Sequence, residues 1–383
     1  MATIQDILAE FREAARSKRD MGDKFERLFS SYLVTEPFYK DRFSQIWLWS
    51  EWPGRGNKPD TGIDLVAEER IGGGLCAIQS KFYDPASTIQ KADLDSFFAT
   101  SGKAPFTSRI VVTTTDNWSR NAEPLLDDER VPCVRVRLQD LEDSAVDWSQ
   151  FSLSRPDKMK LRVKKQPREH QREAIKDVLA GLQEAERGKL IMACGTGKTF
   201  TALKIAEEYA AHRKEASGGC ILFLVPSIAL LSQSLKEWTA ESSLPMHALA
   251  VCSDTAVGKS AADDMEDIRL HDLPFPATTD ARKLAKQLAG LSAPEQVRPL
   301  TVVFSTYQSI ATIHEAQKKH GAPAFDLIVC DEADGHAAHL HGCHQEQGQG
   351  SGRRVVLDGR RKPLWWRVAP PGLWGGHQPR TPG

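Results

Sequence analysis

A glycine-rich loop between an apolar run and a helical pattern is the clearest chemical signal in the sequence. The apolar run 190–192 leads into Gly195-Thr196-Gly197-Lys198-Thr199, and a helical pattern resumes at once. Such glycines let backbone N–H groups close around phosphates, and the helix adds the positive end of its dipole. We expect Lys198 to reach the β- and γ-phosphates of ATP and Thr199 to bind Mg²⁺. The strict motif has glycine where this chain has Met192, so a chance glycine turn is the alternative.

A second group of residues suited to chemistry lies nearer the N-terminus. Residues 61–67 predict a short strand that carries Asp64, and residues 75–83 predict another. Because strand side chains alternate, Gln79 and Lys81 share one face of the second strand. Asp64 and the Gln79 amide oxygen can hold Mg²⁺ beside a scissile phosphate, while Lys81 orients water and offsets developing charge. The alternative is that Asp64 is a turn residue and Lys81 an exposed strand lysine.

An acidic residue on a preceding helix completes this second group. Glu26 lies beside an apolar helical stripe formed by Met21, Phe25, Leu28, Phe29 and Tyr32. The pattern G-x-D followed by Q-x-K resembles the Mrr-like branch of the PD-(D/E)xK nucleases. The resemblance implies a restriction-endonuclease-like α/β module over residues 1–150, with Glu26 as a further catalytic residue. We expect Trp47, Trp49 and Trp52 to pack in its core rather than to stack on bases.

Polar residues on either side of the phosphate loop extend the ATP-site pattern. Arg168-Glu-His-Gln171 opens a helix upstream of the loop, and a strand at 325–330 is followed by Asp331 and Glu332. Asp331 would hold Mg²⁺ through water, and Glu332 would polarise the attacking water. This order of motifs resembles superfamily 2 helicases and translocases. The resemblance implies that Gln171 reads adenine, and we assign Arg168 to the same cofactor-binding site.

Buried strands alternating with helices must position the ATP-site residues. Strands are predicted at 220–225, 248–252 and 301–306, and residues 253–298 read as a polar insertion. The first and last of these strands end in loops similar to helicase motifs Ia and Ib; in the family the motif Ia loop touches DNA phosphates. Such alternation predicts a doubly wound parallel sheet with ATP at the carboxyl ends of the strands. We therefore expect an incomplete RecA-like lobe over residues 168–333.

Composition limits what the chain can be. The 383 residues allow two or three domains, and a net charge of −1 means that any DNA contact must come from local basic patches. The seven cysteines lack C-x-x-C spacing and read as buried reduced thiols. Without a signal peptide or an 18-residue apolar stretch, we expect a cytoplasmic protein. The basic segment 151–167 is expected to be a solvated linker, with contact to a DNA backbone as the alternative.

Taken together, residues 1–333 resemble the N-terminal part of the Type ISP restriction–modification enzymes. The resemblance implies an ATP-dependent DNA restriction endonuclease and translocase that uses ATP and Mg²⁺ and acts on double-stranded DNA. It also implies methyltransferase and target-recognition domains downstream, which nothing in this sequence matches. The alternatives are a repair helicase with an appended nuclease, an inactive remnant, and a DNA-binding module without catalysis.

The composition changes abruptly over residues 334–383, where histidine, glycine, arginine, proline and tryptophan dominate. Read one base over, the codons from Asp334 onward permit Thr-Ala-Thr-Pro-Arg, which looks like motif III of a superfamily 2 motor. We therefore expect an out-of-frame, disordered tail and a motor lobe that binds ATP weakly at most, without translocation. A metal cluster is the alternative reading of His336, His339, His341, Cys343 and His344, although no predicted element would hold such ligands.

Overall fold

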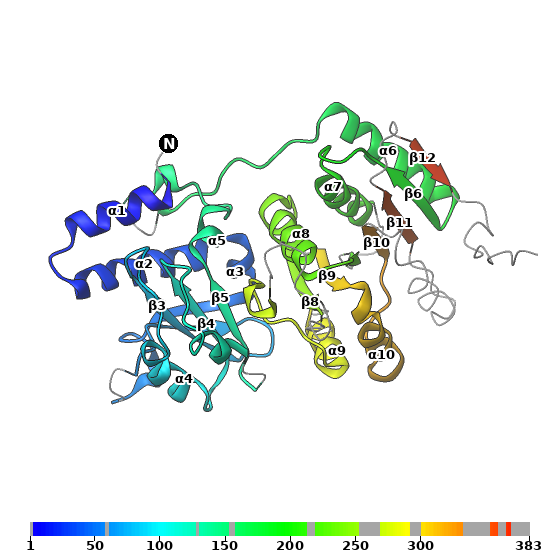
Figure 1. Ribbon diagram of the computed structural model, residues 1–383. Coiled ribbons are helices and arrows are strands. Elements are labelled where there is room, and N and C mark those ends of the chain that lie inside the picture. The colour runs from blue at the N-terminus through cyan, green and yellow to red at the C-terminus, as the bar shows by residue number, and fades with distance from the viewer. Residues whose placement is uncertain are drawn as a thin grey trace, which may run out of the picture.

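Two β-sheets, each with its own helices, organise the chain in the computed structural model (Figure 1). The structure describes residues 3–57, 61–127, 130–152, 158–212, 219–252, 269–291 and 300–331, and the backbone of 353–358 and 365–368. An extended segment joins the N-terminal sheet, in blue to teal, to the C-terminal one (Figure 1). The predicted α/β class is confirmed. None of the helices within the described ranges is long and apolar enough to span a bilayer.

The N-terminal sheet has five strands in the order β1-β2-β3-β4-β5. Strands β1 and β2 run antiparallel to their successors, whereas β3, β4 and β5 are parallel to one another. The strands are β1 (Phe43–Leu48), β2 (Leu65–Glu69), β3 (Leu75–Lys81), β4 (Phe106–Thr113) and β5 (Cys133–Val136). The helices are α1 (Ile4–Ala14), α2 (Lys18–Thr35), α3 (Pro37–Arg42), α4 (Asp95–Ser101) and α5 (Leu138–Glu142).

Apolar stripes hold the helices of the N-terminal part against its sheet. Thr3 caps α1, and the buried side chains of that helix recur at helical spacing. The stripe predicted on α2 is buried apart from Met21, which is only partly covered. Trp49 and Trp52 are buried and their rings stack, which confirms that these two tryptophans belong to the core. Trp47 packs against the same cluster while staying partly exposed.

Two details of this sheet differ from the sequence prediction. Strand β1 was not predicted, because its four apolar and two polar residues do not alternate and five of the six are partly or fully exposed. Strand β2 begins at Leu65 rather than at residue 61, because Gly62 adopts a left-handed φ of 80° that an extended strand excludes. Asp64 therefore lies in the approach to the strand.

The C-terminal sheet has seven strands in the order β12-β6-β11-β10-β7-β9-β8, all parallel except β12. Its first five strands along the chain are β6 (Arg187–Ile191), β7 (Cys220–Val225), β8 (Met246–Val251), β9 (Leu300–Thr306) and β10 (Leu327–Asp331). The helices are α6 (Glu169–Glu184), α7 (Lys198–Ala211), α8 (Ile228–Glu241), α9 (Ala281–Gly290) and α10 (Ile310–His320). The predicted parallel RecA-like sheet is confirmed.

Two strands come from the segment expected to be a disordered tail, and this expectation is corrected for ten of its residues. Strand β11 (Arg353–Asp358) lies between β6 and β10, and β12 (Trp365–Val368) pairs with the outer side of β6. Both segments are rich in valine and tryptophan, which favour strands. Strand β11 therefore fills the place between the strand before the phosphate loop and the strand that ends at Asp331. The remaining tail residues, including those of the histidine–cysteine group, lie outside the described part of the chain.

The basic linker is anchored near its C-terminal end to both parts of the chain, although many of its side chains are exposed. The Arg162 guanidinium donates to the carbonyls of Glu142 and Val146 in the N-terminal part. Lys164 donates to the carbonyl of Ser242, and the Lys165 amide donates to Glu241 Oε2 at 2.7 Å. The described residues of the linker thus contact both parts.

Candidate functional site

Asp64 is positioned against the strand that carries Gln79 and Lys81. Its amide donates to the Ile78 carbonyl at 2.9 Å, and its Oδ2 accepts from the Ser80 amide at 2.6 Å. These two bonds hold the carboxylate beside β3 at the level of Gln79 and Lys81. Asp64 is half-buried, so part of its side chain remains accessible to solvent.

Gln79 offers an oxygen without a protein partner. Its side chain is 1% exposed, and its Oε1 has no hydrogen-bond partner among the described residues. A Cβ at Gly62 would lie 3.2 Å from Gln79 Nε2 and 2.8 Å from Ser96 Oγ. The glycine of G-x-D is thus required both by its left-handed backbone and by the close approach of the Gln79 amide. Buried polar atoms normally have partners, so this oxygen fits a ligand.

Lys81 and Glu26 come from two elements that meet at the end of β3. Lys81 is the last residue of β3 and half-buried, and the Thr114 amide donates to its carbonyl at 3.1 Å. The adjacent Phe82 packs edge-on against Phe25 of α2, with ring centroids 5.6 Å apart. Glu26 follows Phe25 and is also half-buried. The structure therefore brings the helix of Glu26 to the strand end that carries Lys81.

These donors suit Mg²⁺ better than a transition metal. Among the described residues, no group of three or more histidine, cysteine, aspartate or glutamate side chains is arranged to hold an ion. Mg²⁺, in contrast, is commonly held by one or two carboxylates with water and phosphate oxygens completing the shell. A carboxylate and a partnerless amide oxygen fit that requirement.

The phosphate loop follows β6 and ends at the N-terminus of α7. Gly195 and Gly197 have φ angles of 76° and 82°, and Gly197 is the N-cap residue of α7 without a side-chain cap. The first amides of a helix have no partner within it, so α7 presents donors where a phosphate is expected. Met192, the departure from the strict motif, is fully buried, so it serves the core instead of the loop. Lys198 and Thr199 are half-buried at the first positions of α7.

Gln171 connects the start of α6 to the phosphate loop. Its Oε1 accepts from the Arg168 amide at 2.9 Å, and its Nε2 donates to the Thr196 carbonyl at 2.9 Å. A Cβ at Gly197 would lie 2.6 Å from the same Nε2. Gln171 is buried and Arg168 exposed. In this structure Gln171 therefore contacts the loop itself, and its expected contact with adenine stays a prediction.

Asp331 lies at the carboxyl end of β10 and is 5% exposed. Its main-chain carbonyl accepts a hydrogen bond from the hydroxyl of Tyr307 at 2.8 Å. Because β6 and β10 are both parallel members of one sheet, Asp331 and the phosphate loop lie at the same edge. Glu332, the expected partner of the attacking water, lies outside the described residues.

Comparison with known proteins separates the chain into the same two parts. A family model described as "Restriction endonuclease" matches residues 34–158, and one described as "Type III restriction enzyme, res subunit" matches residues 164–346. The solved structure of the ATP-dependent Type ISP restriction–modification enzyme LlaBIII bound to DNA is 35% identical, with a TM-score of 0.78 over 93% of this chain. The chain thus joins a restriction-endonuclease-like part to a helicase-like part, and in this arrangement it is similar to the Type ISP restriction–modification enzymes.

The Type ISP-like chain is also similar to viral helicases. The probable helicase A859L of African swine fever virus, isolate Tick/Malawi/Lil 20-1/1983, is 26% identical over 67% of this chain. The protein of the same name from isolate Pig/Kenya/KEN-50/1950 is 27% identical over 56%. The chain spans about a quarter or less of the length of these relatives, since it covers 22% of LlaBIII and 26% and 21% of the viral proteins.

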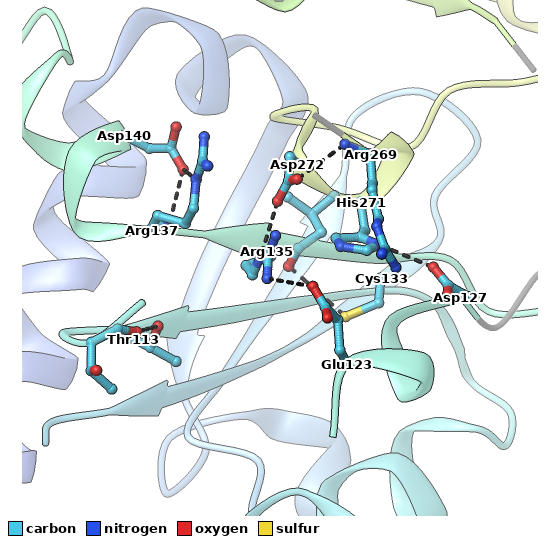
Figure 2. Close-up of polar contacts among 12 residues, drawn as sticks. Thr113, Glu123, Asp127, Cys133, Arg135, Arg137, Asp140, Arg269, His271 and Asp272 are labelled. Carbon is cyan, nitrogen blue, oxygen red and sulfur yellow. Dashed lines mark hydrogen bonds and ion pairs between the residues drawn. The ribbon is translucent and has the colours of Figure 1, made fainter. Parts of the chain in front are cut away.

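Polar contacts join the nuclease and motor parts of the chain (Figure 2), and the sequence analysis did not predict them. Arg135 of β5 forms an ion pair with Asp272, with 2.8 Å between Nε and Oδ1, and His271 Nδ1 lies 3.0 Å from Asp127. Asp272 and His271 belong to the segment read as a polar insertion. Burial by itself raises the pKa of Asp272. The hydrogen bond and the positive charge of Arg135 outweigh this effect and keep the pKa below its usual range.

A buried carboxyl lies close to the same boundary. Glu36, between α2 and α3, is 6% exposed, and its Oε2 accepts from the Ala145 amide at 3.0 Å. Burial raises the pKa of Glu36 to about 7, against the opposing effects of this hydrogen bond and of Arg162. The carboxyl lines a small cavity with Tyr39 and with Lys236 of α8 in the motor part. No local sequence signal distinguishes Glu36, because its burial depends on both parts of the chain.

Proposed function

We propose that the chain supplies the nuclease and motor of an ATP-dependent DNA restriction enzyme. In this proposal, Mg²⁺-dependent cleavage of phosphodiester bonds in double-stranded DNA is coupled in the complete enzyme to ATP-driven translocation, which this chain does not perform by itself. The observation that carries the proposal is the buried, partnerless oxygen of Gln79 beside Asp64, in a chain that also has an uncapped phosphate-loop helix. The similarity to LlaBIII supports the pairing of the two activities.

In the nuclease part, Asp64 and Gln79 hold the metal and Lys81 orients the attacking water. Mg²⁺ supplies Lewis-acid stabilisation of the charge that develops on the phosphate oxygens. The Ser80 and Ile78 backbone fixes Asp64, so its carboxylate needs little reorganisation when the substrate binds. The Lys81 ammonium offsets negative charge at the scissile phosphate, and Glu26 on α2 adds a second carboxylate to the site.

In the motor part, the amides of the phosphate loop and Lys198 bind the nucleotide phosphates. Thr199 and Asp331 bind Mg²⁺, Gln171 and Arg168 bind the base side of the nucleotide, and Glu332 polarises the attacking water. Because Gln171 donates a hydrogen bond to the Thr196 carbonyl, binding of a base at Gln171 would change the conformation of the phosphate loop. ATP and Mg²⁺ are therefore the proposed cofactors, and methyltransferase and target-recognition domains are proposed as partners.

Cleavage of supercoiled plasmid by the purified chain, with Mg²⁺ and with EDTA, tests the nuclease assignment. We expect nicking that requires Mg²⁺ and falls at least 100-fold in Lys81→Ala, while Lys103→Ala, an exposed lysine of the same part, keeps the original rate. A chain that binds duplex DNA but never cleaves it with Mg²⁺ is instead a binding module or an inactive remnant.

A further inference from the structure

A buried tyrosine touches the metal-binding end of the motor sheet. Tyr307 follows β9, is 1% exposed, and donates its hydroxyl proton to the main-chain carbonyl of Asp331 at 2.8 Å. In the sequence this residue falls in the loop that resembles helicase motif Ib, to which no contact with the ATP site was assigned. Its side chain instead faces the carboxyl end of β10.

The contact joins two strands that are not neighbours. Cys330 of β10 is paired with Leu224 of β7, which is paired with Ser305 of β9. Asp331 is one residue beyond this row and Tyr307 two residues beyond it. Two strand spacings separate β9 from β10, about 10 Å. A tyrosine is long enough to cross the end of β7 and reach the far strand, whereas serine or threonine is not.

Packing fixes the tyrosine in place. Tyr307 belongs to an apolar cluster with Leu224, Val251 and Ile328 on the face of the sheet that α9 and α10 cover. A hydrogen bond in such a low-dielectric setting is stronger than one in water. The carbonyl that Tyr307 holds belongs to the planar peptide group between Asp331 and residue 332. The hydroxyl therefore holds the main chain at Asp331, at the end of β10.

We propose that Tyr307 is a positioning residue for the Mg²⁺–nucleotide site and acts through Asp331. This inference rests on the proposed ATP site and deepens it. Loss of the hydroxyl removes one bond from the end of β10 and lets the Asp331 carboxylate depart from the orientation that suits the metal. Phosphate binding by the loop and by Lys198 does not depend on this bond, so only the metal-dependent part of nucleotide affinity changes.

Calorimetric titration of the full chain with ADP, once with Mg²⁺ and once with EDTA, tests the role of Tyr307. In Tyr307→Phe we expect the tightening of ADP binding by Mg²⁺ to shrink roughly 2- to 10-fold, the range of a single hydrogen bond. The affinity measured in EDTA stays unchanged. Tyr39→Phe removes the hydroxyl of another buried tyrosine, in the nuclease part, and serves as the matched control.

The outcomes separate this inference from the ATP site itself. Equal tightening by Mg²⁺ in the unsubstituted chain and in Tyr307→Phe overturns the positioning role and leaves the ATP site intact. Equal weakening with Mg²⁺ and with EDTA also overturns it, because the tyrosine then acts on the whole lobe. If the unsubstituted chain shows no ADP binding that Lys198→Ala removes, both the ATP site and the role of Tyr307 are wrong.

Discussion

Replacing Glu36 by glutamine is expected to flatten the dependence of stability on pH. Burial raises the pKa of Glu36 from an ordinary value of 4.5 to about 7. Between these values the unfolded chain has lost this proton while the folded chain keeps it. Stability contributed by the protonated carboxyl is therefore fully present below pH 4.5 and is lost as the pH rises through about 7.

The size of the effect follows from that interval. Each unit of pKa difference corresponds to about 1.4 kcal/mol, so ionisation of Glu36 costs the folded chain at most roughly 3 kcal/mol by pH 8. Glutamine has no proton to lose and can still accept from the Ala145 amide, which bonds to Glu36 at 3.0 Å. Relative to the unsubstituted chain, Glu36→Gln is expected to gain up to that amount between pH 5 and pH 8.

Urea unfolding at several pH values measures this gain. Trp148 is a suitable fluorescent reporter, because its ring stacks on the ring of Tyr32, with the two centroids 6.1 Å apart. Tyr32 lies one helical turn before Glu36. Glu13→Gln, at an exposed glutamate of the same part, is the matched control and should leave the pH profile unchanged. If the profiles of Glu36→Gln and the unsubstituted chain stay parallel from pH 5 to pH 8, burial of an ionisable carboxyl at the boundary is the wrong explanation.

Two further changes test the site and the boundary. Gly62→Ala should abolish Mg²⁺-dependent cleavage by displacing Gln79, whereas Gly72→Ala, with a φ of 89° but nothing within 4 Å of the added Cβ, should keep it. Both variants should lose roughly 1–2 kcal/mol of unfolding free energy, because alanine is strained in a left-handed backbone conformation. Equal cleavage by both would contradict the importance of the close approach between Gly62 and the Gln79 amide. Asp272→Ala should cost less than the roughly 3–5 kcal/mol of an uncompensated buried charge, since Arg135 keeps its 3.5 Å ion pair with Glu123. Adding Arg135→Ala should recover part of that loss, and strictly additive losses in urea unfolding would contradict the ion pair. Truncation of the exposed Glu315–Lys319 pair is the control and should leave the unfolding midpoint nearly unchanged.

The sequence predicted the parts of the sites that depend on local backbone geometry. Period-two alternation on β3 puts Gln79 and Lys81 on one face, and the positive-φ glycines of the phosphate loop lie where the motif predicts them. The glycine of G-x-D was recognised by resemblance, but its physical reason appears only in three dimensions. That reason is the approach of the Gln79 amide, which is seventeen positions away in the chain.

Contacts between distant segments could not be predicted from the sequence. Arg135 and Asp272 are 137 positions apart, and nothing in either neighbourhood indicates a partner. Tyr307 was visible as part of a motif, yet its bond to Asp331 depends on the register of three strands. Strands β11 and β12 were missed because the surrounding composition hid two short runs of strand-favouring residues within 334–383.

The anchoring of the linker has a consequence for where a cut would fall. A domain on a flexible linker samples many positions within a volume set by the length of that linker, so its location is given only by an effective concentration. Here Arg162 is bonded to the nuclease part, and Lys164 and Lys165 are bonded to the motor part. These contacts hold the nuclease part at a fixed distance from the motor part. In the complete enzyme, if cleavage and translocation are coupled as proposed, lengthening the linker by a few glycines should broaden the distribution of cut positions more than it changes the rate of cutting.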